Sequence, residues 1–173
     1  EQAAQLTASP ADPPAIYDIK VNARPVDMTS LVQYAAEAVT RLAEQNNLVL
    51  HSVLPGEPLN MLTDSTVAKQ VLVSILSHCV QQAGQGTLIL TLHNDPSSRV
   101  LDLEFPLHEE MTPAPVISSV TERLINSLDW KVEQYHTASS GVVRLYFEAK
   151  VVTLLVIDDD EGLGELIERY LTG

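Results

Sequence analysis

The clearest candidate for chemistry is a run of three aspartates close to the end of the sequence. Residues 153–157 (TLLVI) have the composition of a buried strand, and Asp158, Asp159 and Asp160 follow directly. Carboxylates gathered at the carboxyl end of a strand suit a hard cation such as Mg²⁺, which prefers oxygen ligands. The cluster of carboxylates therefore suits a cation site, with a solvated strand end as the alternative.

The histidines and the single cysteine form no comparable pattern. His51, His78, His93 and His108 are scattered without a metal-ligand spacing, so we interpret them as ordinary polar or capping residues. Cys79 lies within an apolar helical pattern, which indicates a small buried hydrophobic residue. A lone cysteine also excludes an internal disulfide and a cysteine-based zinc site.

Composition limits the class of protein. With 173 residues, of which 45% are hydrophobic, the chain can form one domain with a real core and a short additional piece. Its formal net charge of −13 repels phosphate backbones, so we expect no direct nucleic-acid binding. No apolar run reaches the roughly 18 residues of a membrane helix, and no secretion signal is visible. We therefore expect no membrane contact by this segment. We also expect the chain to be a fragment of a longer cytoplasmic protein.

Hydrophobic periodicity predicts an alternation of helices and strands after an N-terminal linker or edge strand at residues 1–25. Asp27 and Asp64 are expected N-caps. In the third helix, Val120, Leu124 and Leu128 are expected to share the buried face. The predicted helices are 28–46, 64–82 and 116–128, and the predicted strands are 48–54, 87–94, 99–105, 131–135 and 142–150. Three helices on one face of a mixed sheet make a two-layer α/β sandwich.

This order of elements over residues 26–150 resembles the catalytic ATPase domain of sensor histidine kinases, in the GHKL superfamily. Residues 25–50 are similar to the opening helix and strand of that family, and residues 64–92 to the helix that holds its N box and the next strand. Residues 116–149 resemble its closing helix and hairpin. The resemblance implies an ATP site, which the following positions put in doubt.

Two N-box positions depart from the family's pattern. Active members carry two Asn residues four apart, which help to hold the Mg²⁺ that bridges the ATP phosphates. The matching positions here are Ser74 and His78. Serine is too short to reach the same ion, and histidine offers a soft nitrogen where magnesium prefers oxygen.

The adenine and lid motifs depart as well. The family's third strand ends in Asp-x-Gly-x-Gly, whose Asp accepts a hydrogen bond from adenine. Strand alternation puts Phe105 at the Asp position and Leu107 at the first Gly. The lid shrinks to residues 107–115 without glycine, and Glu109 and Glu110 would repel a triphosphate. We expect these losses to move ATP binding out of a useful range.

Residues 151–173 are similar to the first strand and helix of a response-regulator receiver domain. That resemblance implies that Asp158 and Asp159 bind Mg²⁺ once a complete receiver is present, because the other residues of such a site lie beyond Gly173. We expect no cofactor for the present chain. A short strand at Thr153–Ile157 would expose unpaired backbone groups, so we expect it either to pair with a sheet edge of the main domain or to mediate a homodimer.

The leading hypothesis is a non-catalytic, pseudokinase-like module of a two-component phosphorelay protein. It would act as a scaffold or coupling domain before a receiver, with protein partners from the same pathway. The first alternative is a nucleotide-binding or ATP-dependent histidine kinase catalytic domain with an altered site. The second is that the old ATP cavity, lined by Ser74, His78 and Phe105, accepts another small molecule.

Overall fold

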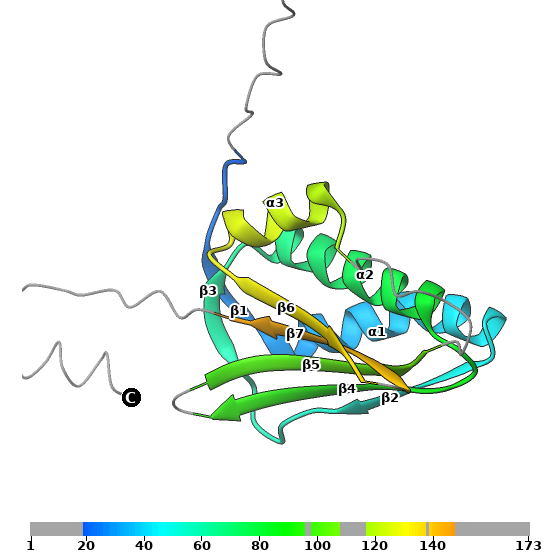
Figure 1. Ribbon diagram of the computed structural model, residues 1–173. Helices are drawn as coiled ribbons and strands as arrows, with labels where there is room; N and C mark the ends of the chain where they lie inside the picture. Colours follow the sequence, from blue (N-terminus) through cyan, green and yellow to red (C-terminus); the bar gives the residue numbers. More distant parts are fainter. Residues whose placement is uncertain (1–18, 96–97, 108–116, 138, 148–173) are drawn as a thin grey trace, which may run out of the picture.

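Five strands form a mixed sheet, and three helices cover one of its faces (Figure 1). This computed structural model describes residues 19–95, 98–107, 117–137 and 139–147. The elements are β1 (Arg24–Asp27), α1 (Met28–Gln45), β2 (Leu48–Val53), β3 (Asn60–Thr63), α2 (Ser65–Gln82), β4 (Gly86–Asp95), β5 (Ser98–Pro106), α3 (Ser119–Ser127), β6 (Lys131–His136) and β7 (Ser140–Tyr146). The predicted two-layer α/β sandwich is confirmed.

The strand order in the large sheet is β2-β4-β5-β7-β6. Strands β2 and β4 are parallel, and the other neighbours are antiparallel. The pairs β4–β5 and β6–β7 are antiparallel hairpins formed by the four strands predicted at 87–94, 99–105, 131–135 and 142–150. Because side chains alternate along each strand, one face of the sheet is apolar and lies under the helices. The buried side chains of that face include Leu88, Leu90, Leu92, Leu101, Leu103, Phe105, Val143 and Leu145.

Both long helices begin after a capping aspartate, as predicted. Asp27 accepts hydrogen bonds from the backbone N–H groups of Thr29 at 2.9 Å and Ser30 at 3.3 Å. Asp64 accepts two from the first turn of α2, at 2.9 and 3.2 Å. The Ser30 side chain lowers the pKa of Asp27, and the backbone N–H of Asn22 lowers that of Asp64. Each carboxylate thus satisfies donors that the helix leaves unpaired.

A small second sheet joins the segment before α1 to the segment before α2. Strand β1 pairs antiparallel with β3, with Val26 opposite Met61. The pattern of residues 1–25 predicted a linker or an edge strand, and β1 begins within that range, whereas no strand was predicted between residues 54 and 64. Strand β3 has only four residues, too few for its alternation to stand out, and the long-range pairing with β1 defines it.

The buried face of α3 also differs from the prediction. Val120 is 63% exposed, whereas Thr121 and Ile125 are buried. Leu128 is buried as expected, just beyond the end of the helix. The prediction assigned the core face to the apolar residue at position 120, but a hydrogen-bonded threonine occupies it.

Residues 108–116 and 148–173 lie outside the described residues. The predicted metal-binding acids Asp158 and Asp159 and the predicted strand Thr153–Ile157 therefore remain predictions.

Candidate functional site

Ser74 and His78 lie on the same face of α2, one helical turn apart. The Ser74 hydroxyl is 2.8 Å from the Thr121 hydroxyl on α3, and Thr121 is also 2.9 Å from the Ser118 hydroxyl. The His78 Nδ1 atom is 2.8 Å from the Ser74 carbonyl oxygen, so a protonated Nδ1 donates to it. Both side chains at the N-box positions are thus engaged within the protein. The sequence analysis did not foresee the role of Thr121, because hydroxyl pairs between distant helices leave no periodic signal.

Phe105 occupies the end of β5 and is only 2% exposed. It is paired in register with Gly141 on β7, and its ring lies directly over that glycine. A Cβ atom added to Gly141 would come within 2.6 Å of the Phe105 ring. The aromatic ring therefore fills the space that the missing side chain at position 141 leaves, and position 105 offers no hydrogen-bond acceptor.

Leu107 and its neighbours tie the end of β5 to the end of α2. Leu107 is half-buried and forms an isolated bridge with Ala83. The backbone N–H of Gly84 donates to the Pro106 carbonyl at 2.8 Å, and that of Leu107 donates to the Ser139 carbonyl at 3.0 Å. The chain thus leaves β5 in a fixed direction beside the helix that carries Ser74.

Gln82 follows His78 by one more turn of α2 and so shares its face. Its side-chain Oε1 atom is buried and has no hydrogen-bond partner among the described residues. An unpaired buried acceptor is costly, so this atom marks a place where a donor is expected. The sequence analysis overlooked this residue.

Trp130 is a packing residue. It is 2% exposed, and its ring meets that of Phe147 edge to face, with centroids 4.8 Å apart. Cys79 is fully buried, as expected, and burial raises the pKa of its thiol.

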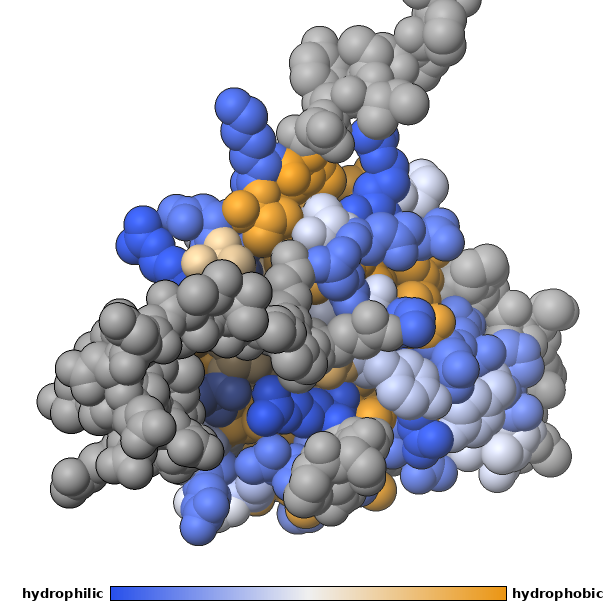
Figure 2. Space-filling model, turned by 90° about the vertical axis from the view of Figure 1, so that its left-hand side faces the viewer, coloured by the Kyte–Doolittle hydropathy of each residue, from blue (hydrophilic) through white to orange (hydrophobic). Residues whose placement is uncertain are grey.

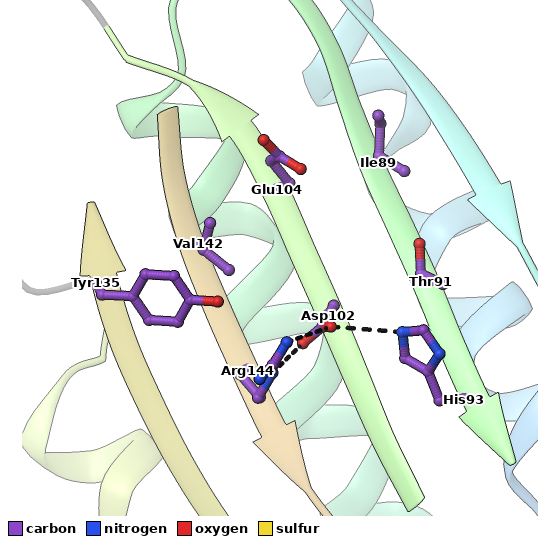
Figure 3. Close-up of a pocket in the computed structure, with 8 residues that line it drawn as sticks. All are labelled: Ile89, Thr91, His93, Asp102, Glu104, Tyr135, Val142 and Arg144. Atoms are coloured by element: carbon purple, nitrogen blue, oxygen red, sulfur yellow. Dashed lines mark hydrogen bonds and ion pairs between the residues drawn. The ribbon is translucent and has the colours of Figure 1, made fainter. Parts of the chain in front are cut away.

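A second candidate site lies on the opposite, open face of the sheet (Figure 3). A pocket of about 230 Å³ is lined there by Ile89, Thr91, His93, Asp102, Glu104, Tyr135, Val142 and Arg144. Arg144 donates two hydrogen bonds to the Asp102 carboxylate, at 2.7 and 2.8 Å, which raises the pKa of the arginine. His93 Nε2 lies 3.4 Å from the same carboxylate.

Asp102 and Glu104 alternate with buried apolar residues along β5 and therefore lie on the polar side of that strand. The available signal was the charged or polar side chains that alternate on neighbouring strands, such as Arg144 opposite Asp102. Only the strand order brings these positions from β4, β5, β6 and β7 together.

Hydrophilic side chains cover most of the coloured surface on the side that lies at the left of Figure 1, with hydrophobic ones in smaller patches (Figure 2). Within the described ranges, no three His, Cys, Asp or Glu residues are grouped so that they could hold a metal ion. None of the helices there is long and apolar enough to span a membrane.

The sequence matches no known protein family and no curated protein. Solved structures, in contrast, match the fold well. Histidine kinase AdeS of Acinetobacter baumannii aligns with a TM-score of 0.64 and 16% identity, over 77% of this chain and 70% of that one. The catalytic domain of histidine kinase ThkA aligns with a TM-score of 0.60 and 13% identity, over 74% of this chain and 96% of that one.

Full-length ShkA, solved with AMPPNP, aligns with a TM-score of 0.60 and 17% identity; the match covers 80% of this chain and 33% of that one. The TM-scores establish the shared architecture. Because the sequence identities are this low, the activity has to be argued from the site. The described part of the chain therefore has the fold of histidine kinase catalytic domains.

Proposed function

We propose that this chain is a non-catalytic signalling module of a cytoplasmic two-component protein, in which a histidine kinase ATPase fold serves as a scaffold or coupling domain before a receiver. The observation that carries the proposal is the hydrogen bond of Ser74 to Thr121, because the resemblance predicts a metal-binding asparagine at position 74.

The N-box face of α2 is poorly suited to hold a metal-bound triphosphate. Mg²⁺ requires oxygen ligands at about 2.0–2.1 Å in near-octahedral geometry. The hydroxyl of Ser74 already pairs with Thr121, and the His78 side chain offers only nitrogen. Neither residue can replace the carboxamide oxygen of an asparagine at the same backbone position.

The adenine position supports the same conclusion. Phe105 is buried against Gly141 and cannot accept a hydrogen bond from an amino group. A donor left unpaired in a buried site costs about 1–3 kcal/mol, which corresponds to roughly a 5- to 150-fold loss of affinity. Together with the altered metal ligands, this loss favours a module that works without ATP.

The Oε1 atom of Gln82 favours one alternative, an altered ligand site beside Ser74 and His78 on α2. This buried acceptor lies on the face of α2 that carries His78, and it has no partner within the described part of the chain. A ligand with an amino or amide N–H group would satisfy it. Adenosine is therefore a necessary probe beside ATP.

Titration calorimetry of the full chain with ATP and Mg²⁺, with ATP alone and with adenosine tests the proposal. We expect no heat of binding and no shift in melting temperature at millimolar ligand. A micromolar Kd for ATP would contradict the proposal. Binding of adenosine that is lost in Gln82→Leu but kept in Gln81→Leu, an exposed neighbour, would establish the altered site instead.

We further propose that residues 151–173 begin a receiver domain in the longer protein, with Asp158 and Asp159 as its Mg²⁺ ligands. A version extended through the complete receiver should then incorporate phosphate from acetyl phosphate only with Mg²⁺. The variants Asp158→Asn and Asp159→Asn should each reduce incorporation strongly, while Asp160→Asn should retain most of it. Equal incorporation in all three variants would contradict this assignment.

A further inference from the structure

The open face of the sheet carries one row of side chains that combines apolar walls with a single unpaired acid. Ile89 on β4 is opposite Glu104 on β5, Glu104 is opposite Val142 on β7, and Val142 is opposite Tyr135 on β6. All four line the pocket of about 230 Å³ (Figure 3). The Glu104 carboxylate thus lies between two aliphatic side chains, with the Tyr135 ring beside them.

The charges in this pocket do not cancel. The Arg144 guanidinium group donates one hydrogen bond to each oxygen of the Asp102 carboxylate, so these two charges neutralise each other. His93 lies beside the same carboxylate. Glu104 is exposed, and its carboxylate has no partner among the described residues. Among Asp102, Glu104 and Arg144, the charge of Glu104 alone is therefore left uncompensated.

We propose that this pocket receives an arginine side chain from a basic segment of a partner protein. A guanidinium group matches a carboxylate such as Glu104 with two parallel hydrogen bonds and stacks on an aromatic face such as Tyr135. The aliphatic stem of arginine packs on side chains such as Ile89 and Val142. The net charge of −13 attracts a basic partner and raises its association rate.

The surroundings of the pocket suit a protein segment better than a free amine or a second copy of the chain. Val49 and Val53, on the neighbouring edge strand β2, are 65% and 45% exposed, and a segment with apolar residues beside its arginine would cover them. A second copy would carry the same net charge of −13, so the two chains would repel each other. The site lies on the face of the sheet away from α2, so it does not depend on the state of the nucleotide cleft.

NMR titration of the full chain, labelled with ¹⁵N, tests the inference with the peptides acetyl-Val-Arg-Val-amide and acetyl-Val-Gln-Val-amide. We expect saturable shifts of amides in β4, β5 and β7 with the arginine peptide, and at least roughly fivefold weaker binding of the glutamine peptide. Glu104→Gln should weaken arginine-peptide binding about three- to fivefold, as expected for one exposed ion pair. Glu57→Gln, an exposed acid in the loop before β3, is the matched control and should leave binding unchanged.

Five results would overturn the inference. Equal binding of the two peptides would remove the role of the guanidinium, and unchanged binding in Glu104→Gln would remove the role of the carboxylate. Agmatine that binds as tightly as the peptide would assign the pocket to a free amine. The absence of shifts on this face, or self-association that depends on Glu104, would mean that the chain itself or a second copy covers the pocket.

Discussion

The side-chain hydroxyl of Ser74 on α2 lies 2.8 Å from that of Thr121 on α3, and this contact joins two helices across 47 residues of sequence. Thr121 is 3% exposed and is also bonded to Ser118, so a chain of three hydroxyls fixes α3 beside the N-box face. The contact means that this face of α2 packs against α3 and helps to hold the two helices together.

Ser74→Ala should destabilise the fold modestly. Thr121 keeps its bond to Ser118, so we expect a loss of about 0.5–1 kcal/mol in the free energy of unfolding, as for one hydrogen bond. Urea titration followed by the fluorescence of the single, buried Trp130 measures this loss. Ser77→Ala, on the same helix and without a side-chain hydrogen bond in the described structure, is the control. An equal effect of both variants would argue against the helix–helix contact.

Gly141→Ala should destabilise the protein because the new Cβ atom meets the Phe105 ring at 2.6 Å. The ring is buried and cannot move aside freely, so we expect a cost of about 1–3 kcal/mol, as in other overpacked cores. The cost should be smaller in a Phe105→Leu background, since the shorter side chain leaves room. A double-mutant cycle from denaturant titrations tests this, and additive effects would contradict the proposed contact.

Cys79 should be inert in the native protein. Its side chain is fully buried, and burial raises its thiol pKa, so the reactive thiolate is almost absent at pH 8. Ellman's reagent should release no colour from the folded chain and one equivalent after urea is added, because the sequence has one cysteine. Rapid modification of the native protein would show that α2 opens locally.

Asp64 should make stability depend on acid pH. Hydrogen bonds lower its pKa in the folded state, so the folded protein binds fewer protons than the unfolded chain and stability rises with pH. The contribution is complete above the unfolded pKa of about 4 and is lost as the pH falls through the folded pKa. Wild type should therefore exceed Asp64→Asn in stability at pH 7 but not at pH 2. Asp64→Ala should cost about 1 kcal/mol at pH 7. Urea titrations at both pH values check this, with Glu57→Gln as control, and a pH-independent difference would contradict it.

Local patterns in the sequence were sufficient for most of the secondary structure. The caps Asp27 and Asp64 and the ranges of α1 and α2 follow from local patterns, because helix periodicity and capping act over a few residues. The alternation in β5 separates Leu101, Leu103 and Phe105 from Asp102 and Glu104. The likeness to histidine kinase domains also rested on this continuous order of elements.

What the sequence determined by itself was therefore the layered fold and the types of residue at positions 74, 78, 105 and 107. Tertiary structure alone decided which residues meet. The pairing of Ser74 with Thr121, the fit of Phe105 over Gly141 and the row from Ile89 to Tyr135 each join segments far apart in the chain. The physical reason is that contacts between elements depend on strand order and helix rotation, and short-range periodicity in the sequence contains no information about either.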